Sequence, residues 1–134
     1  MSDVRIRRSA GAVVSLGLHL VWCPKFRRRV LVGRVAQRAE DIIYQIATEH
    51  GWEIVALEVM PDHVHVFVRC RAADSPADVA QAFKGRTSRV LRSEFAHLSR
   101  RRVLWSKSYF CASVGYVSES TVRHYIEHQW DAAA

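Results

Sequence analysis

The sequence predicts an α+β fold, because strand-like and helix-like patterns alternate along a chain of 134 residues. The expected order is strand, helix, strand, strand, helix, strand and helix. Two β-α-β halves in a chain of this size are typical of a ferredoxin-like split β-α-β antiparallel sheet with helices on one face. An extra C-terminal helix would follow the sheet. The length predicts a single domain over residues 1–134, in which residues 1–10 are expected to be a loose basic arm.

The most regular strand pattern begins at His63, where three valines alternate with His63, His65 and Phe67. This period of two is that of a half-buried strand, so the valines would face a core and both imidazoles the opposite side. Residues 52–60 form the preceding strand. The Pro61–Asp62 pair supplies turn-forming residues between the two strands, which predicts an antiparallel hairpin.

The first half of the chain supplies one more strand and one helix. Residues 13–23 are rich in valine and leucine and predict the first strand, which Pro24 ends. From residue 34 to residue 50, apolar residues recur at intervals of three and four, which predicts an amphipathic helix. Gly51 stands where a left-handed helix stop is expected.

The second half repeats this alternation. A helix is predicted from Pro76 to about residue 95, with Ser75 as its cap and proline at its first position. Residues 103–114 predict the last strand. A final helix begins at one of the serines of residues 118–120 and continues into the C-terminal tail.

The charge indicates an anionic partner. The net charge is +7, and only three of the 20 basic residues are lysines, which leaves 17 arginines. Guanidinium groups bind phosphate oxygens in a bidentate fork, so nucleic acid is the favoured partner over an inert basic surface. Residues 25–29 form a basic loop with one aromatic, which suits a phosphate contact beside a stacked base. A solvated charged loop is the alternative. Residues 100–102 form a second arginine run.

Other classes of protein are disfavoured. Cys23, Cys70 and Cys111 are widely spaced and odd in number, which indicates reduced, buried thiols and a cytoplasmic protein. Arginines before the apolar run of residues 10–18 imitate a signal peptide, but no small-residue cleavage site follows. No run reaches the roughly 18 to 20 apolar residues that span a bilayer, so no membrane association is expected.

Two spacings point to chemistry, although each has a structural alternative. His63 and His65 on one strand face can converge on one metal ion, but such a pair is also common in packing or on a surface. Tyr125 and Gln129 are four residues apart and share one face of the final helix. A tyrosine beside a metal ligand suits attack on a phosphodiester, whereas Tyr125 alone would be read as a core-edge aromatic.

Five motifs occur together and cover nearly the whole chain. They are residues 19–27 (HLVWCPKFR), 60–65 (MPDHVH), 84–89 (KGRTSR), 104–110 (LWSKSYF) and 125–129 (YIEHQ). In this order they resemble the single-tyrosine HUH transposases of the IS200 class of small bacterial insertion sequences. The term HUH denotes a His-hydrophobe-His signature, which here is His63-Val64-His65. Phe26 departs from the family by replacing a common tyrosine, and Cys70 replaces a small polar residue.

The resemblance implies a metal site and a nucleophile. It assigns His63, His65 and Gln129 as ligands of a divalent metal, Mg²⁺ with Mn²⁺ as a possible substitute, and Tyr125 as the nucleophile. Magnesium prefers oxygen donors, so an ion completed by DNA phosphate and water would fit two imidazoles best. His128 is an alternative third ligand in place of Gln129.

The resemblance also implies a reaction and partners. Single-stranded DNA with hairpin ends would be cut to leave a 5′-phosphotyrosine and a free 3′-hydroxyl, and rejoined without a nucleotide cofactor. The family forms homodimers with active sites shared between subunits, so Tyr125 of one subunit would serve the histidines of the other. In a bacterial or archaeal cell the protein would lie in the cytoplasm, on the nucleoid when bound to DNA. The expected DNA-binding residues are Arg27, Arg28, Lys84, Arg86 and Arg89.

Three alternatives stay open on the sequence. A domesticated hairpin-DNA nickase would keep the same residues without moving an element. A non-catalytic ferredoxin-like nucleic-acid-binding module would not need the hydroxyl of Tyr125. A structural zinc protein would need a fourth strong ligand, which the sequence does not offer.

Overall fold

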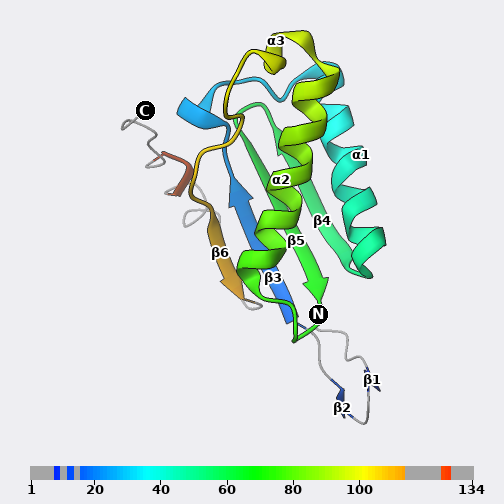
Figure 1. Cartoon of the computed structure of the whole chain (residues 1–134). Helices are drawn as coiled ribbons and strands as arrows, with labels where there is room; N and C mark the ends of the chain where they lie inside the picture. Colours follow the sequence, from blue (N-terminus) through cyan, green and yellow to red (C-terminus); the bar gives the residue numbers. More distant parts are fainter. Residues whose placement is uncertain (1–7, 10–11, 14–15, 114–124, 128–134) are drawn as a thin grey trace.

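The computed structural model describes residues 8–9, 12–13, 16–113 and 125–127. Its centre is a four-stranded sheet with the order β4-β5-β3-β6, in which every neighbouring pair is antiparallel (Figure 1). This strand order is that of the ferredoxin-like split β-α-β fold, so the predicted α+β fold class is confirmed. The strands are β3 (Leu16–Trp22), β4 (Glu53–Met60), β5 (His63–Cys70) and β6 (Phe110–Ser113).

The two long helices, α1 (Gly33–His50) and α2 (Pro76–Glu94), lie side by side on one face of the sheet (Figure 1). Their ends are those that the sequence predicts. Gly51 adopts a left-handed conformation with φ of 73° after α1, and the Ser75 hydroxyl accepts a hydrogen bond from the Asp78 N–H at 3.0 Å. The short helices are η1 (Lys25–Arg27) and α3 (Ala96–Ser99).

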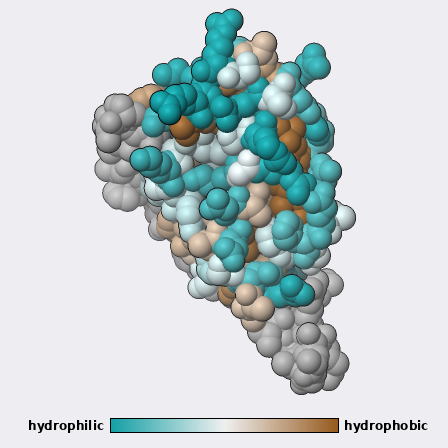
Figure 2. Space-filling model, in the orientation of Figure 1, coloured by the Kyte–Doolittle hydropathy of each residue, from teal (hydrophilic) through white to brown (hydrophobic). Residues whose placement is uncertain are grey.

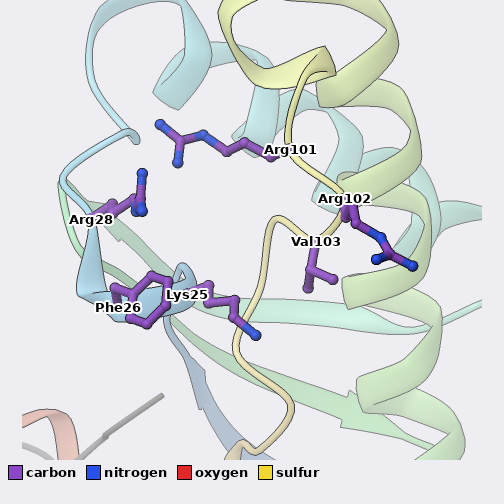
Figure 3. A pocket seen from close by; sticks show the side chains of 6 residues that line it. All are labelled: Lys25, Phe26, Arg28, Arg101, Arg102 and Val103. Carbon is purple, nitrogen blue, oxygen red and sulfur yellow. The ribbon is translucent and has the colours of Figure 1, made fainter. Parts of the chain in front are cut away.

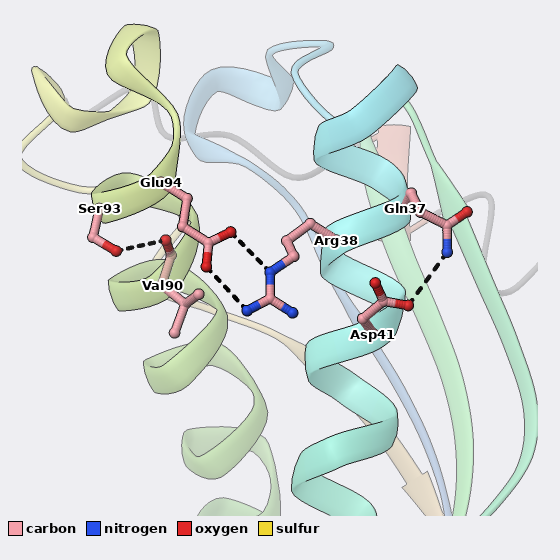
Figure 4. Close-up of polar contacts among 6 residues, drawn as sticks. All are labelled: Gln37, Arg38, Asp41, Val90, Ser93 and Glu94. Atoms are coloured by element: carbon pink, nitrogen blue, oxygen red, sulfur yellow. Dashed lines mark hydrogen bonds and ion pairs between the residues drawn. The ribbon is translucent and has the colours of Figure 1, made fainter.

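A two-point ion pair joins the exposed sides of the long helices (Figure 4). The Arg38 guanidinium of α1 donates to both carboxylate oxygens of Glu94 in α2, at 2.8 and 3.0 Å. Because both side chains face solvent, the pair orients the two helices more than it stabilises the fold. The apolar contacts beneath it supply most of the cohesion.

The core lies between the helices and one face of the sheet. The three valines of β5 are fully buried there, together with Leu18, Leu20 and Trp22 of β3. From α1 the apolar stripe of Ile42, Ile43 and Ile46 packs against them. The strand alternation of β5 is therefore confirmed, and its histidines lie on the face that α1 and α2 leave uncovered.

Two predicted segments differ at the N-terminal end. The predicted strand of residues 13–23 is shorter, because β3 begins at Leu16 and the preceding β2 (Ala12–Val13) pairs elsewhere. Its partner is β1 (Arg8–Ser9), with which it forms a separate two-stranded antiparallel sheet. The backbone of residues 12–13 thus bonds locally instead of extending the main sheet. Of the predicted basic arm, only Arg8–Ser9 is described, as β1; residues 1–7 and 10 lie outside the described residues, so the loose arm stays a prediction.

The predicted strand of residues 103–114 is also shorter, since β6 begins only at Phe110. The reason is visible at Lys84 of α2, whose ammonium group donates to the backbone carbonyls of Ser106, Lys107 and Ser108. Three consecutive carbonyls directed at one ammonium group are incompatible with the alternating carbonyl directions of a strand. The segment is a loop that α2 holds against the sheet.

Seen from the helix side, the molecular surface is mainly hydrophilic, with hydrophobic residues visible in limited areas between polar ones (Figure 2). This is the face that α1 and α2 cover in the same orientation of Figure 1. None of the helices among the described residues combines the length and the apolar character needed to cross a membrane.

A buried polar contact ties α2 to the loop before β6 and provides a test of the fold. Thr87 is fully buried, and its hydroxyl donates to the Phe83 carbonyl at 2.6 Å and accepts from the Trp105 indole N–H at 3.0 Å. Thr87→Val keeps the shape but removes both bonds, while the Trp105 indole N–H still donates to the Lys84 carbonyl at 3.1 Å, so we expect the free energy of unfolding to fall by about 1 kcal/mol. Urea unfolding measures this change.

The matched control is Thr48→Val, at an exposed position of α1, where a change within about 0.5 kcal/mol is expected. Equal free energies of unfolding for the two variants would contradict the role of the Thr87 hydroxyl.

Candidate active site

The uncovered face of the sheet carries a row of side chains from three adjacent strands. In the register of the sheet, His65 of β5 lies opposite Val21 of β3, and Val21 lies opposite Phe110 of β6. The Tyr125 ring lies against the Phe110 ring, with centroids 5.6 Å apart, and Ile126 packs on Val21. Neighbouring strands are about 4.8 Å apart. Tyr125 therefore lies on the histidine face of its own chain, over the strand two positions from β5.

His63 is oriented by a carboxylate. Its Nδ1 lies 2.9 Å from the Asp62 carboxylate, whose other oxygen accepts from the Arg27 guanidinium at 3.3 Å. Burial alone would raise the pKa of Asp62, but the hydrogen bond and the charge of His63, together with Arg27, hold this pKa below its ordinary value. A neutral ring that donates from Nδ1 keeps its lone pair on Nε2. This arrangement is usual for metal-binding histidines.

His65 has a second histidine as its neighbour. Its Nε2 lies 3.3 Å from Nδ1 of His19, whose ring stacks on Phe67 with centroids 4.3 Å apart. Partial burial, followed by the charge of His19, lowers the pKa of His65, while Glu58 on β4 acts in the opposite direction without overcoming them. Burial also lowers the pKa of His19. Both shifts favour the neutral imidazole of His65 and of His19, the form that can bind a metal.

The hydroxyl of Tyr125 lies beside the loop that precedes β6. It lies 3.4 Å from the Ser108 hydroxyl, and Ser108 belongs to the loop whose carbonyls accept hydrogen bonds from Lys84. The Lys84 ammonium lies 2.8 Å from the Ser106 carbonyl and 3.2 Å from the two that follow. A chain of contacts thus leads from α2 through the loop to the phenol. The loop thereby lies beside the phenol of Tyr125 on the histidine face of the sheet.

Both His19 and Ser108 contact expected site residues, yet neither is among the residues that the sequence predicts for the site. Each stands inside a quoted motif, which is the signal that could have marked them. Placing His19 beside His65 requires the β3–β5 register, and placing Ser108 beside Tyr125 requires the path of the loop. Neither follows from spacing along the chain.

The expected ligand set is present only in part. Within the described ranges, no group of three or more His, Cys, Asp or Glu side chains is placed to hold a metal. Gln129 and the alternative ligand His128 lie outside the described residues. The donors that the structure places, His63 and His65, fit an open site that oxygen donors would have to complete.

The residues expected to bind DNA lie on two separate elements. Arg27 and Arg28 lie at the end of η1, and the other three lie along α2. Most of these side chains have contacts within the protein, so binding DNA remains a prediction for each. The contacts are Arg27 with Asp62, Arg28 over the Phe26 ring, Lys84 with the loop carbonyls and Arg86 with Glu49 at 2.7 Å, while Arg89 is exposed.

Comparison with known protein families gives one match over most of the chain. The model of a family described as IS200-like transposases matches residues 12–129. The match includes the histidine strand, the loop before β6 that Lys84 contacts, and the segment that contains Tyr125.

Individual relatives agree with this match. The chain is 34% identical over 131 residues to the ISDra2 transposase TnpA of Deinococcus radiodurans, an alignment that covers 96% of this chain and 94% of the relative. It is 26% identical over 114 residues to the transposase for insertion sequence element IS200 of Salmonella typhimurium, covering 83% and 74% of the two chains.

Solved structures share the fold. A crystal structure of a candidate transposase from Deinococcus radiodurans superimposes with a TM-score of 0.86 and 37% identity, over 94% of this chain and 99% of that one. A tyrosine transposase associated with REP elements, solved bound to a REP hairpin, has a TM-score of 0.56 and 17% identity, over 96% of this chain and 70% of that one. The second likeness concerns the fold alone.

The lowered histidine pKa values predict a dependence of stability on pH. Protonating His65 in the folded protein costs more than in the unfolded chain, so the free energy of unfolding should fall as the pH drops below the ordinary histidine pKa of 6.5. We expect urea unfolding in a chelator to give a lower free energy at about pH 5.5 than at about pH 7.5. His65→Gln should reduce this difference.

His97→Gln is the control, because His97 is exposed on α3, and it should keep the pH dependence of the unchanged protein. An equal pH dependence in His65→Gln would show that burial of His65 does not cause the effect.

Proposed function

The chain belongs to the IS200-like transposase family, and on that premise we propose that it cuts and rejoins single-stranded DNA through Tyr125. The observation that supports this most strongly is the position of Tyr125. Its ring rests on Phe110, in the sheet row that also contains His65, and its hydroxyl is near Ser108. A phenol on the same sheet face as paired imidazoles has the components of a phosphodiester transfer site.

In the proposed cleavage step, the Tyr125 oxygen attacks the phosphorus of the scissile phosphodiester. A bond forms between this oxygen and phosphorus, and the bond from phosphorus to the 3′-oxygen breaks. The phenol loses its proton, and the departing 3′-oxygen gains one, which leaves a 5′-phosphotyrosine and a free 3′-hydroxyl. Rejoining reverses these changes at a new 3′-hydroxyl. Because the phosphotyrosine keeps the energy of the broken phosphodiester bond, no nucleotide cofactor is needed.

A divalent metal, Mg²⁺ or Mn²⁺, is part of this proposal. His63 and His65 would hold it, together with Gln129 or His128, and when bound it would supply Lewis-acid polarisation of the phosphate. The role of Asp62 is then to fix the ring of His63 through the 2.9 Å contact at Nδ1. Ser108 would keep the phenol from turning away from the sheet face.

The proposed substrate is single-stranded DNA with hairpin ends. The net charge of +7 supports an anionic partner. A REP-associated tyrosine transposase of the same fold is bound to a REP hairpin, so a fold of this kind can accommodate such DNA. Arg27, Arg28, Lys84, Arg86 and Arg89 remain the proposed contacts.

The proposed assembly is a homodimer with shared active sites. In the described part of the chain, β4 and β6 are the outer strands of the sheet, and an outer strand can pair with a strand of a second copy. The C-terminal helix would carry Tyr125 to the histidines of either subunit. Residues 125–127 are helical here, and the other residues of the predicted final helix lie outside the described residues.

The proposed chemistry predicts a covalent adduct that depends on Tyr125 and His63. The purified chain is incubated with Mg²⁺ and labelled single strands from the DNA that flanks its gene, each containing a hairpin, and adducts are resolved on a denaturing gel. We expect Tyr125→Phe to abolish the adduct, because it removes the attacking oxygen, and His63→Ala to reduce it at least about 100-fold. A chelator should have the same effect as His63→Ala.

Tyr44→Phe and His97→Ala are the matched controls, since both residues are exposed on helices of the other side. An adduct that persists in Tyr125→Phe would assign the nucleophile elsewhere. If the chain binds the strands but forms no adduct in any form, a non-catalytic nucleic-acid-binding module is the better description.

The shared site predicts complementation between inactive variants. A mixture of Tyr125→Phe and His63→Ala chains contains mixed dimers in which one composite site has an intact tyrosine from one subunit and intact histidines from the other. We expect the adduct to reappear, on the His63→Ala chain only, at up to about a quarter of the unmixed activity if subunits exchange at random. Mass-tagged chains identify which subunit carries the DNA. No recovery, with exchange verified by the tags, would favour a site within one chain.

A further inference from the structure

A cavity of about 600 Å³ lies where the two arginine-containing runs of the sequence meet. It is lined by Lys25, Phe26, Arg28, Arg101, Arg102 and Val103 (Figure 3). The two segments are joined at its base, where the Lys25 N–H donates to the Leu104 carbonyl at 2.9 Å and a β-bridge pairs Pro24 with Trp105. Ligand sites are commonly about 300 to 1,000 Å³ in volume, so this one has room for a nucleotide.

The charge of this cavity favours an anion. Four of its six lining residues are cationic, and none of the six carries a carboxylate. Arg101 extends toward the side of the cavity on which Arg28 lies (Figure 3). Its Nε is buried, and among the described residues it has no hydrogen-bond partner. The Arg101 guanidinium therefore adds positive charge to the cavity, and phosphate is the anion that guanidinium groups bind best.

The aromatic residue of the cavity is held in an uncommon conformation. Phe26 has φ of 63° and ψ of 17°, and Arg27 has φ of 53°, both in the left-handed region that non-glycine residues rarely adopt. Nevertheless Phe26 remains 46% exposed, with the Arg28 guanidinium 5.2 Å from its ring centroid. Such strain persists where the surrounding fold imposes it, often at binding sites. The Lys25 ammonium also lies over this ring, 5.7 Å from its centroid, so a base that stacks on Phe26 would replace one of these two cations.

We infer that this cavity binds an unpaired nucleotide of the DNA strand, with the base stacked on Phe26 and the phosphate between Arg28 and Arg101. The inference rests on the proposed function and adds a second contact site to it. An unpaired base has an open π-face for the ring, whereas both faces of a base inside a duplex are covered by its neighbours. Between the two arginines a phosphate would be held bidentately.

The cavity is connected to the candidate active site through one loop. Arg27, which follows Phe26, donates to the carboxylate of Asp62, and that carboxylate contacts His63. A strand anchored at Phe26 would therefore leave the cavity beside the histidine face of the sheet. The site would hold the strand near the phosphodiester to be cut, without contacting the reacting atoms.

Binding in a chelator tests this site without cleavage. The probe is a fluorescein-labelled single strand of mixed sequence with one 2-aminopurine, whose fluorescence falls when it stacks on an aromatic ring. We expect Phe26→Leu to weaken binding about 10-fold and to remove the additional quenching, and Phe26→Trp to restore both. Arg101→Met should weaken binding and lower the slope of log K against log salt by about 0.7, the value for one phosphate contact with single strands.

Two control variants replace an aromatic residue and an arginine that do not line the cavity. Tyr44→Leu replaces an exposed aromatic of α1, and Arg71→Met replaces an exposed arginine after β5. Both should bind like the unchanged protein. Arg102→Met is a further lining variant at an exposed position, for use if a thermal melt shows that Phe26→Leu or Arg101→Met is unfolded.

The inference is overturned if the lining variants bind the single strand as the control variants do. It is also overturned if the annealed duplex binds as tightly as the single strand with the same dependence on Phe26, or if RNA of the same sequence binds more tightly. These outcomes are separate from failure of the proposed function, which is a persistent adduct in Tyr125→Phe, because binding in a chelator requires no cleavage.

Discussion

The register between β3 and its two neighbours is the constraint on which the rest of this structure depends. Successive side chains of a strand point to opposite faces, so a slip of one residue would bury His65 and expose the valines on either side of it. Full burial of those valines against α1 and α2 makes such a slip costly. The same register sets His65, Val21 and Phe110 in one row and gives Tyr125 and Ile126 a surface to rest on.

The Tyr125 segment is not held by that row alone. Lys84 and Thr87 belong to the buried side of the molecule, yet they determine the path of the loop before β6, one through three carbonyls and the other through the Trp105 indole. The loop in turn brings Ser108 to the phenol. Contacts of α2 with this loop thus help to place residues on the opposite face of the sheet. Substitutions in α2 can therefore alter the geometry of the candidate active site. Lys84 acts here as a structural cation, whatever its part in binding DNA.

Sequence patterns predicted those features that depend on local physics. The left-handed stop at Gly51, the cap at Ser75 and the two faces of β5 each follow from a few neighbouring residues, and all are confirmed. Register and loop paths depend on distant partners. For this reason the contact of His19 with His65 was missed and the strand before residue 110 was overextended. The position of Gln129, the expected metal ligand, stays a prediction because this residue lies outside the described residues.

The exposed site at Phe26 shows a further limit of sequence patterns, and it also has an energetic consequence. In the sequence, residues 25–29 and residues 100–102 are two separate charge runs, whereas the fold sets Lys25, Arg28, Arg101 and Arg102 around one cavity. Their mutual repulsion destabilises the folded protein when no anion is bound. Salt weakens this repulsion, with a screening length of about 10 Å at 0.1 M. Salt also weakens the attraction of the same groups for phosphate. Ionic strength therefore acts in opposite directions on the stability of this region and on its affinity for DNA, as expected if these charges are positioned for a ligand rather than for the fold.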